Sequence, residues 1–168
     1  MIGLIDSGVG GANVLPTNSF IQYRSANFIS YGSLSEGCLI SFLDTHIKYL
    51  QSKKVDNIYV GCYTLSCLIK KLRLDLPVTT MLDLVDLSDF DTVIATNYTC
   101  KYFESTHQVI RCPRLATQIE LRLPIELPMY YNENVGRLLL GCTHYYSIAQ
   151  VIQEYYKPTE LVMPKFIV

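Results

Sequence analysis

The sequence has no excess of positive charge and no long apolar run. Its 14 Lys and Arg residues are balanced by 15 Asp and Glu residues, which gives a formal net charge of −1. Nucleic-acid and anionic-membrane surfaces usually carry a basic excess. A helix that spans a bilayer needs about 20 consecutive apolar residues. The composition therefore argues against a nucleic-acid partner and against a membrane partner.

Signals for export, for metal binding and for a bound cofactor are also missing. The start of the chain, "MIGLIDSGVGG", lacks the basic segment and apolar core of a signal peptide. Six cysteines are present, but none forms the C-x-x-C pair typical of zinc sites and redox dithiols. We therefore expect reduced thiols in a cytoplasmic protein, with no bound metal. No lysine-centred pyridoxal phosphate motif is found, and this favours chemistry without a cofactor.

What the sequence does contain is a regular alternation of apolar strand patterns and amphipathic helix patterns. Nearly half of the residues are hydrophobic, at 49%, and 17% are charged, as in a packed globular protein. The expected strands are 2–5, 27–31, 57–61, 77–81, 91–96, 108–112, 136–141 and 160–163. The first expected helix follows a capping box at Ser33 and Glu36 and runs to about Lys54. The other expected helices cover 64–72, 99–105, 114–120 and 147–156. This order predicts an α/β fold whose mainly parallel sheets are flanked by helices.

The stretch "PVTTMLDLVDLSDFDT" is a candidate crossing between two lobes. On this interpretation residues 1–86, together with about 150–168, form the first lobe, and residues 87–149 form the second. In parallel α/β folds, ligands bind beyond the carboxyl ends of the strands. Most of the polar motifs of the chain fall at such strand ends, which predicts one shared pocket.

Two of these strand ends carry the same unusual feature, a cysteine after a glycine. "IYVGCYTLSCLI" covers 58–69 and "RLLLGCTHYYSI" covers 137–148. The N-terminus of a following helix favours thiolate, so each thiol pKa should fall from about 8.5 toward neutrality. One thiolate could remove a carbon-bound proton while an opposed thiol returns a proton to the other face. The repeat of Cys62 and Cys142 therefore predicts inversion at one carbon.

The motifs "DSGVGG", "YG", "GCYT", "ATNYT", "CPRLATQIE" and "LGCTHY", in this order, resemble those of the glutamate racemase branch of the aspartate/glutamate racemase family. The resemblance covers most of the chain and is most specific in "DSGVGG" and "LGCTHY". It implies two pseudo-symmetric lobes with the active site in the cleft between them. It also implies cofactor-independent interconversion of L- and D-glutamate, in which the D-form feeds peptidoglycan. The expected ligand is thus a small acidic amino acid.

The resemblance also assigns roles to residues by their place in these motifs. Cys62 and Cys142 match the two catalytic acid/bases, with Cys62 abstracting from the D-isomer and Cys142 from the L-isomer. Asp6, Glu120 and His144 match the polar groups that assist the thiols. The positions that match substrate contacts are Asp6, Ser7, Tyr31, Gly32, Tyr63, Thr64, Thr99, Thr143 and His144.

Three departures from the family pattern leave alternatives open. Tyr63 stands where the family has Asn, the chain is trimmed around Leu121 to Val135 and lacks a C-terminal helix, and Pro16 falls where the first helix should run. The alternatives are a catalytically impaired homologue that binds a ligand or partner, and a sister racemase acting on aspartate or another small acid. A second subunit in a homodimer could cover the cleft edge that the trimming exposes.

Overall fold

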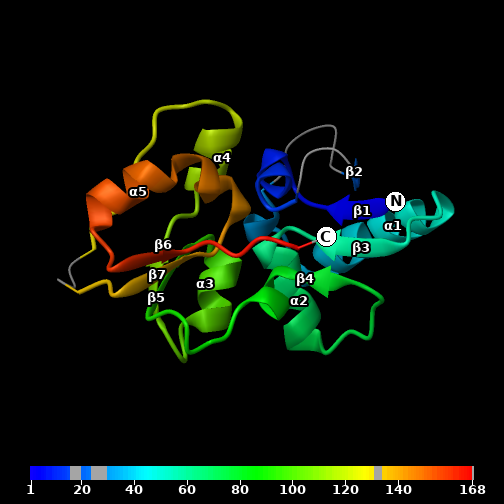
Figure 1. The fold of residues 1–168 in the computed structure, drawn as a ribbon, viewed down its shortest axis with the longest axis horizontal. Coiled ribbons are helices and arrows are strands. Elements are labelled where there is room, and N and C mark those ends of the chain that lie inside the picture. The colour runs from blue at the N-terminus through cyan, green and yellow to red at the C-terminus, as the bar shows by residue number, and fades with distance from the viewer. Residues whose placement is uncertain (16–19, 24–29, 131–133, 168) are drawn as a thin grey trace.

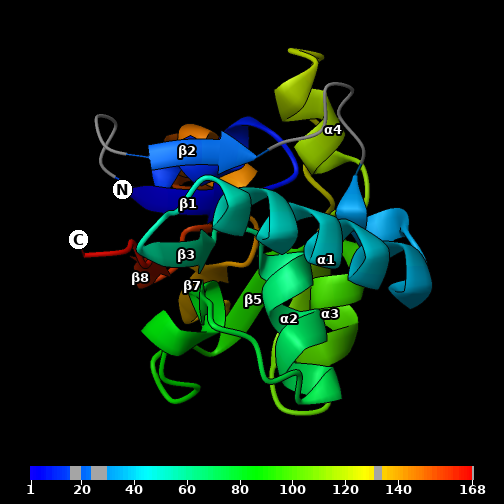
Figure 2. The same cartoon turned by 90° about the vertical axis from the view of Figure 1, so that its right-hand side faces the viewer.

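Two parallel four-stranded sheets lie side by side, with helices packed around them (Figures 1 and 2). The structure, a computed structural model, describes residues 1–15, 20–23, 30–130 and 134–167. The strands of the first sheet are β1 (Ile2–Ile5), β2 (Phe20–Tyr23), β3 (Asn57–Val60) and β4 (Thr79–Thr80). Those of the second sheet are β5 (Thr92–Ala95), β6 (Gln108–Arg111), β7 (Arg137–Leu140) and β8 (Glu160–Val162). The expected α/β fold with parallel sheets flanked by helices is confirmed.

Helices follow most of the strands. The α-helices are α1 (Glu36–Ser52), α2 (Tyr63–Leu72), α3 (Asn97–Phe103), α4 (Leu115–Glu120) and α5 (Ala149–Tyr156). Short 3₁₀ helices are η1 (Val9–Asn13), η2 (Tyr31–Ser33), η3 (Met81–Leu84) and η4 (Thr143–Ile148). Every residue of α2 from Tyr63 to Ile69 is buried, because this helix packs against α1 on one side and against α3 of the other half. Helix α2 therefore helps to join the two halves.

The two sheets share one strand order, which makes the halves pseudo-symmetric. In the order of the chain, each sheet places its second strand at one edge, followed by its first, third and fourth strands. The third strands, β3 and β7, both end in Gly-Cys. Gly61 N donates to the Ile5 carbonyl, and Gly141 N donates to the Ile94 carbonyl, each at 2.9 Å. The repeated Gly-Cys unit of the sequence is thus the same structural position built twice.

The structure moves several of the expected element boundaries. The second strand is Phe20–Tyr23, which had not been expected. A strand had been expected over 27–31. Of that range, residues 27–29 lie outside the described residues, and Tyr31 begins a 3₁₀ helix. The expected cap at Ser33 is wrong, because Ser35 caps α1 by accepting a hydrogen bond from Cys38 N at 3.3 Å. Helix α3 begins at Asn97 rather than Thr99. Pro16 lies outside the described residues, and η1 ends before it, at Asn13.

The last part of the chain belongs to both halves rather than to the first lobe alone. Strand β8 pairs in parallel with β7, so the expected assignment of residues 150–168 to the first lobe is wrong for this strand. Beyond β8 the chain returns to the first sheet (Figure 1). There Phe166 N donates to the Val14 carbonyl at 2.9 Å, and the Phe166 ring lies 4.7 Å from that of Tyr59. This tail is a second physical link between the halves.

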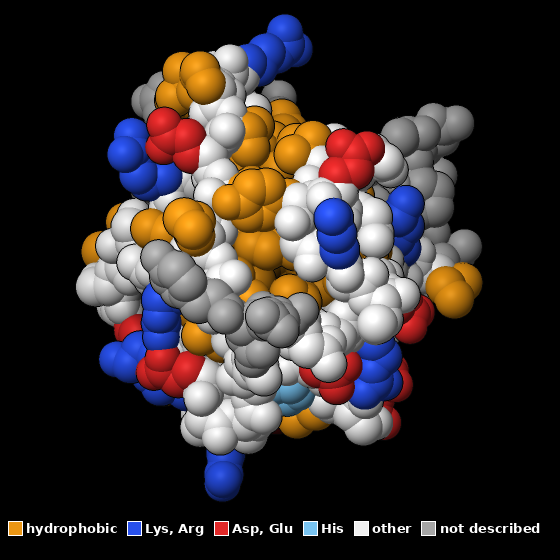
Figure 3. Space-filling model, turned by 90° about the vertical axis from the view of Figure 1, so that its left-hand side faces the viewer, with side chains coloured by type: hydrophobic (Ala, Val, Ile, Leu, Met, Phe, Trp, Pro, Cys, Tyr) orange, Lys and Arg blue, Asp and Glu red, His pale blue; other side chains and the backbone are white. Residues whose placement is uncertain are grey.

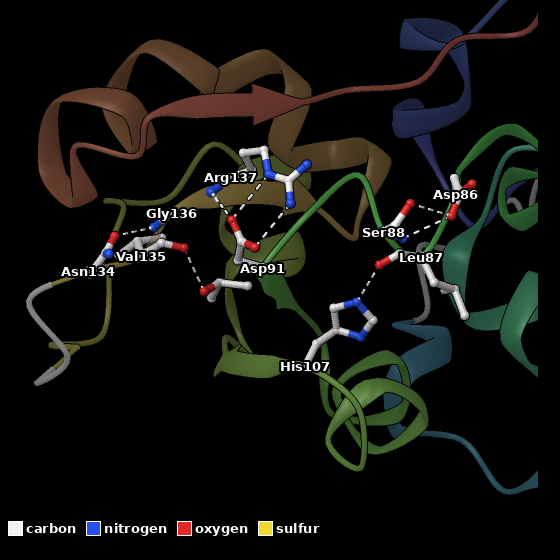
Figure 4. A network of polar contacts seen from close by, with 10 residues as sticks. Asp86, Leu87, Ser88, Asp91, His107, Asn134, Val135, Gly136 and Arg137 are labelled. Carbon is white, nitrogen blue, oxygen red and sulfur yellow. Dashed lines mark hydrogen bonds and ion pairs between the residues drawn. The ribbon is translucent and has the colours of Figure 1, made fainter.

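The crossing from the first sheet to the second is held by polar contacts at the start of β5 (Figure 4). The His107 ring nitrogen Nε2 lies 2.8 Å from the Leu87 carbonyl oxygen. The Asp91 carboxylate accepts from the backbone N of Arg137 at 2.8 Å and from its guanidinium at 3.1 and 3.2 Å. The contacts between Asp91 and Arg137 hold the starts of β5 and β7 together, at the end of the sheet opposite to their polar strand ends.

Apolar side chains are exposed at the far end of the second half. Val151 and Tyr155 on α5 are about half exposed, and Met129 lies in the segment before β7. Figure 3 shows apolar side chains gathered on this end of the molecule. Among the described helices, none is both long and apolar enough to cross a bilayer.

Two glycine substitutions test how the local backbone is built. Gly136 has a φ of +62°, and a Cβ there would lie 2.5 Å from Asp91 Oδ2. Gly136→Ala should therefore lower the free energy of unfolding by about 1–2 kcal/mol. The control is Gly37→Ala in α1, where an added Cβ would contact nothing within 4 Å. That change should raise stability by about 0.5–1 kcal/mol, because alanine favours helix. Urea unfolding followed by circular dichroism measures both, and equal effects of the two changes would contradict the account.

Candidate active site

A narrow cavity lies between the two sheets, at the carboxyl ends of their strands. The volume within it that the centre of a water molecule can reach is only about 20 Å³, so the two walls lie close together. Elements of both halves contribute to its wall, so it has the location predicted from the polar strand ends. The lining residues are Asp6, Ser7, Ser30, Tyr31, Gly32, Cys62, Tyr63, Thr64, Thr96, Ala116, Gly141, Cys142, Thr143 and His144.

Two thiols enter this cavity from the two sheets. Cys62 follows β3 and is the N-cap residue of α2, and Cys142 follows β7 and is the N-cap residue of η4. Their exposed fractions are only 7% and 9%. Because the two positions are equivalent in the two sheets, the thiols approach the cavity from different halves of the molecule.

The thiols are not acidified in the way that their helix positions had suggested. Burial raises the pKa of Cys62 to about 12, and the nearby Asp6 carboxylate adds to the shift. Burial also raises the pKa of Cys142 well above its ordinary value. Backbone N–H groups at the start of each following helix oppose these shifts, but desolvation is the larger effect. The expectation of partial thiolate near neutral pH is therefore wrong for these buried thiols.

Asp6 is a buried carboxyl group at the cavity wall with the properties of a proton acceptor. One of its oxygens, Oδ2, accepts from Gly11 N at 2.6 Å. Within the described part of the chain the other oxygen, Oδ1, is buried without a hydrogen-bond partner. Burial raises the pKa of Asp6 to about 6, although the nearby His144 and several backbone N–H groups oppose this shift. Asp6 thus has an open acceptor oxygen and a pKa close to neutrality, as suits a general acid or base.

Cys142 has a polar chain of its own. Its sulfur lies 3.8 Å from His144 Nδ1, and His144 Nε2 lies 2.7 Å from Glu120 Oε2. The same Glu120 oxygen accepts from Val9 N, in the first half, at 3.0 Å. Glu120 does not line the cavity, but it holds the imidazole that does. The arrangement could move a proton from the sulfur toward the histidine.

The glycines of "DSGVGG" allow η1 to pack directly on the turn that follows Cys142. A Cβ on Gly10 would lie 2.5 Å from Thr143 Oγ1 and 2.7 Å from His144 N, which is closer than real side chains approach. Only glycine fits here without moving one half away from the other. This motif therefore sets the spacing between the two walls of the site.

The cavity wall contains hydroxyl groups but neither Arg nor Lys. Ser7, Thr64, Thr96 and Thr143 all line it, and Thr64 Oγ1 lies 3.4 Å from Thr96 Oγ1 across the two halves. A bound carboxylate would therefore depend on hydroxyls and on backbone N–H groups at helix starts.

Most of the residues expected from the sequence come together here. Among the expected substrate contacts one does not: Thr99 lies fully buried in α3 and is absent from the cavity wall. The residue of "ATNYT" that does line the cavity is Thr96, which directly follows β5. Sequence reasoning also missed Ser30, Ala116 and Gly141. The strand-end rule could have identified Thr96 and Gly141, whereas no local signal marks the other two.

Tyr63 is a large side chain at the edge of the cavity. Only 2% of it is exposed, and it belongs to the hydrophobic core between the sheets. Burial, together with the neighbouring Tyr146, raises the pKa of its phenol well above the ordinary value. Tyr63 thus fills space beside Cys62 with a neutral phenol.

Comparison with known proteins relates this arrangement to glutamate racemases. No protein-family model matches the chain. The chain is 28% identical over 189 residues to the glutamate racemase of Thermoanaerobacter sp. (strain X514), an alignment that covers 91% of this chain and 71% of that relative. It is 26% identical over 200 residues to the glutamate racemase of Carboxydothermus hydrogenoformans, covering 97% of this chain and 75% of that one.

Solved structures show the same fold. The glutamate racemase of Francisella tularensis in complex with D-glutamate superposes with a TM-score of 0.76 at 24% identity, covering 97% of this chain and 75% of that one. The enzyme of Thermus thermophilus in complex with β-chloro-D-alanine gives a TM-score of 0.76 at 22% identity, covering 96% and 74%. The chain is thus similar to these racemases over nearly its whole length, while it spans about three quarters of theirs.

Replacement of Asp6 by asparagine tests how much the buried carboxylate costs in stability. The folded-state pKa of about 6 exceeds the ordinary value of 3.8. As the pH rises through this window, the wild-type carboxyl ionises less readily when folded, so stability falls. Asp6→Asn cannot ionise, and at pH 7 it should be more stable than wild type by about 1–3 kcal/mol. Urea unfolding between pH 4 and 7 measures this. A variant that is less stable than wild type at every pH would show that burial of this charge is not costly.

Proposed function

We propose that this chain is a racemase that interconverts L- and D-glutamate without a cofactor, supplying D-glutamate for peptidoglycan. The observation that carries the proposal is the presence of two thiols from equivalent strand ends of two sheets in the wall of one cavity. The similarity to proteins named glutamate racemase supports the same activity. Inversion needs an acid and a base on opposite faces of one carbon, and the two halves each supply one.

Proton transfer in the L-to-D direction would begin at Cys142. As a thiolate, Cys142 takes the Cα proton of L-glutamate, and the electron pair of the broken C–H bond remains on the substrate as a carbanion conjugated with the α-carboxylate. The Cys62 thiol then donates its proton to the opposite face of Cα. D-glutamate is formed, Cys142 is left protonated and Cys62 is left as thiolate. The reverse direction exchanges the two roles.

Neutral thiols in this cavity fit one half of this cycle, because the acid must hold its proton. The base must first lose a proton, and each thiol has a polar neighbour to receive it. Asp6 is close enough to Cys62 to influence its pKa, and His144, held by Glu120, lies beside Cys142. We assign Asp6, His144 and Glu120 these assisting roles. A bound ammonium group could also contact the open Oδ1 atom of Asp6.

Tyr63 supports a second candidate, a racemase for a smaller acid such as aspartate, or a binder that does not turn over. A buried phenol occupies space beside Cys62 where a smaller side chain would leave room. Aspartate is one methylene shorter than glutamate. A cavity that discriminates by one methylene typically does so by about 1–3 kcal/mol, so both substrates must be measured.

Single cysteine-to-serine variants test the two-base assignment. In deuterium oxide, wild type should racemise glutamate and incorporate deuterium at Cα, followed by proton NMR and circular dichroism. Cys62→Ser and Cys142→Ser should both lose racemisation, because a hydroxyl is a far weaker base than a thiolate. Cys62→Ser should exchange only the Cα proton of L-glutamate, and Cys142→Ser only that of D-glutamate. Racemisation at the wild-type rate in both variants would exclude the thiols, and a wild type inert toward glutamate and aspartate would favour the binder.

Tyr63→Asn tests whether the phenol limits the cavity. The smaller amide should raise kcat/KM for glutamate several-fold relative to aspartate, because glutamate has the larger side chain to fit. Tyr63→Phe is the matched control, since it keeps the ring and should leave the ratio of the two kcat/KM values near that of wild type. If Tyr63→Asn leaves this ratio unchanged or lowers it, the phenol is part of a cavity built around it.

A further inference from the structure

Asn13, the last residue of η1, reaches from the first half to the backbone of the catalytic turn in the second. Its side-chain nitrogen Nδ2 donates to the Thr143 carbonyl oxygen at 2.9 Å. Asn13 does not line the cavity that holds the two thiols. It therefore contacts the site from outside the cavity, at the peptide bond between Thr143 and His144.

The geometry of that peptide bond gives the contact its meaning. No peptide bond among the described residues is cis, so the Thr143 carbonyl and the His144 N–H share one plane and point in opposite directions. Asn13 holds the oxygen end. At the other end of this peptide, His144 places its ring nitrogen Nδ1 3.8 Å from the Cys142 sulfur. A contact that holds the peptide therefore also holds the imidazole beside the sulfur.

We propose that Asn13 is a positioning residue for Cys142, because by holding the Thr143 carbonyl it keeps the His144 imidazole beside the sulfur. This inference rests on the proposed function, in which Cys142 is the base for L-glutamate. It assigns Asn13 an effect on one of the two thiols only, although both line the same cavity.

Cys62 has no comparable need. Cys62 is the N-cap residue of the α-helix α2. That helix is braced locally, because Ser66 Oγ donates to the Cys62 carbonyl at 2.8 Å and accepts from Met81 N at 3.2 Å. The turn after Cys142 is a 3₁₀ helix, which is less regular and has poorer hydrogen-bond geometry. Asn13 therefore stabilises the turn after Cys142 by a contact from the other half, whereas α2 is stabilised by hydrogen bonds of its own.

The closeness of η1 makes this bond rigid. The backbone of Gly10 lies directly against Thr143 and His144, so η1 cannot slide away without opening the site. Asn13 follows Gly10 by three residues on the same short helix. The glycine contact sets the distance between the two turns, and the Asn13 amide sets the orientation of the peptide.

The test uses Asn13→Leu, which keeps the branched shape and approximate size of the side chain, adds no charge and removes the donor. In the Cys62→Ser background, Asn13→Leu should slow Cα exchange of L-glutamate about three- to tenfold, the factor that one lost hydrogen bond between neutral groups is worth. In the Cys142→Ser background, it should change exchange of D-glutamate less than twofold. A merely structural role would slow both. Equal slowing of both exchanges, or no slowing of either, would overturn the inference.

Tyr146→Phe is the matched control on the same 3₁₀ helix. It removes the hydrogen bond from Tyr146 Oη to the Pro164 carbonyl at 2.9 Å and leaves the Thr143 peptide untouched. It should affect the two exchange reactions equally. A selective loss of L-glutamate exchange in this control would mean that any weakening of η4 has the effect, and the assignment to Asn13 would fail.

Alkylation by iodoacetamide separates failure of this inference from failure of the proposed function, because it needs no turnover. At a fixed pH of 8 the reaction rate follows the thiolate fraction. Peptide mass spectrometry of otherwise unmodified wild type and Asn13→Leu gives the rate at each cysteine. Cys142 should react several-fold more slowly in the variant, with Cys62 unchanged. If the parent variants exchange neither enantiomer, the proposed function fails, and an unchanged rate at Cys142 overturns the role of Asn13 whatever the activity.

Discussion

The site depends on the close contact between the glycine-rich turn after β1 and the Cys142 turn after β7. Gly10 lies so near Thr143 and His144 that any side chain there would separate them. Three further hydrogen bonds cross the same boundary, from Val9 N to Glu120, from Asn13 to Thr143 and from Phe166 N to Val14. Because the cavity lies between the halves, these contacts fix how far apart its two thiols are held.

Burial of the thiols disfavours their ionisation but also strengthens the electrostatic interactions of the site. Desolvation keeps Cys62 and Cys142 neutral, and it also raises the pKa of Asp6 toward neutrality. A site that excludes water strengthens every hydrogen bond formed to a charge that develops on the substrate. The same exclusion means that a thiolate can form only where a fixed N–H or a proton acceptor is already aimed at the sulfur. Asp6, near Cys62, and the His144 imidazole, beside Cys142, meet this requirement.

The sequence reveals the chemical residues better than their surroundings. The repeated Gly-Cys unit predicts both thiols, because a strand end followed by a helix start is a local pattern. Thr99 was expected in the cavity, but Thr96 takes that place, since the first residue after β5 faces the pocket while Thr99 turns into the core. Strand Phe20–Tyr23 was missed, and its parallel pairing with β1, a contact between distant parts of the sequence, defines it. The thiol pKa values were misjudged because burial is a property of the whole fold.

A ligand-bound crystal structure would test the central claim most directly. The account predicts that D-glutamate binds between the sheets with its Cα flanked by the sulfurs of Cys62 and Cys142 on opposite faces, each within about 3–4 Å of that carbon, as proton transfer requires. The ammonium group should lie on the Asp6 side and the carboxylates on hydroxyls and backbone N–H groups. An electron density map in which both sulfurs lie on one face of Cα, or in which D-glutamate binds outside this cavity, would contradict the account.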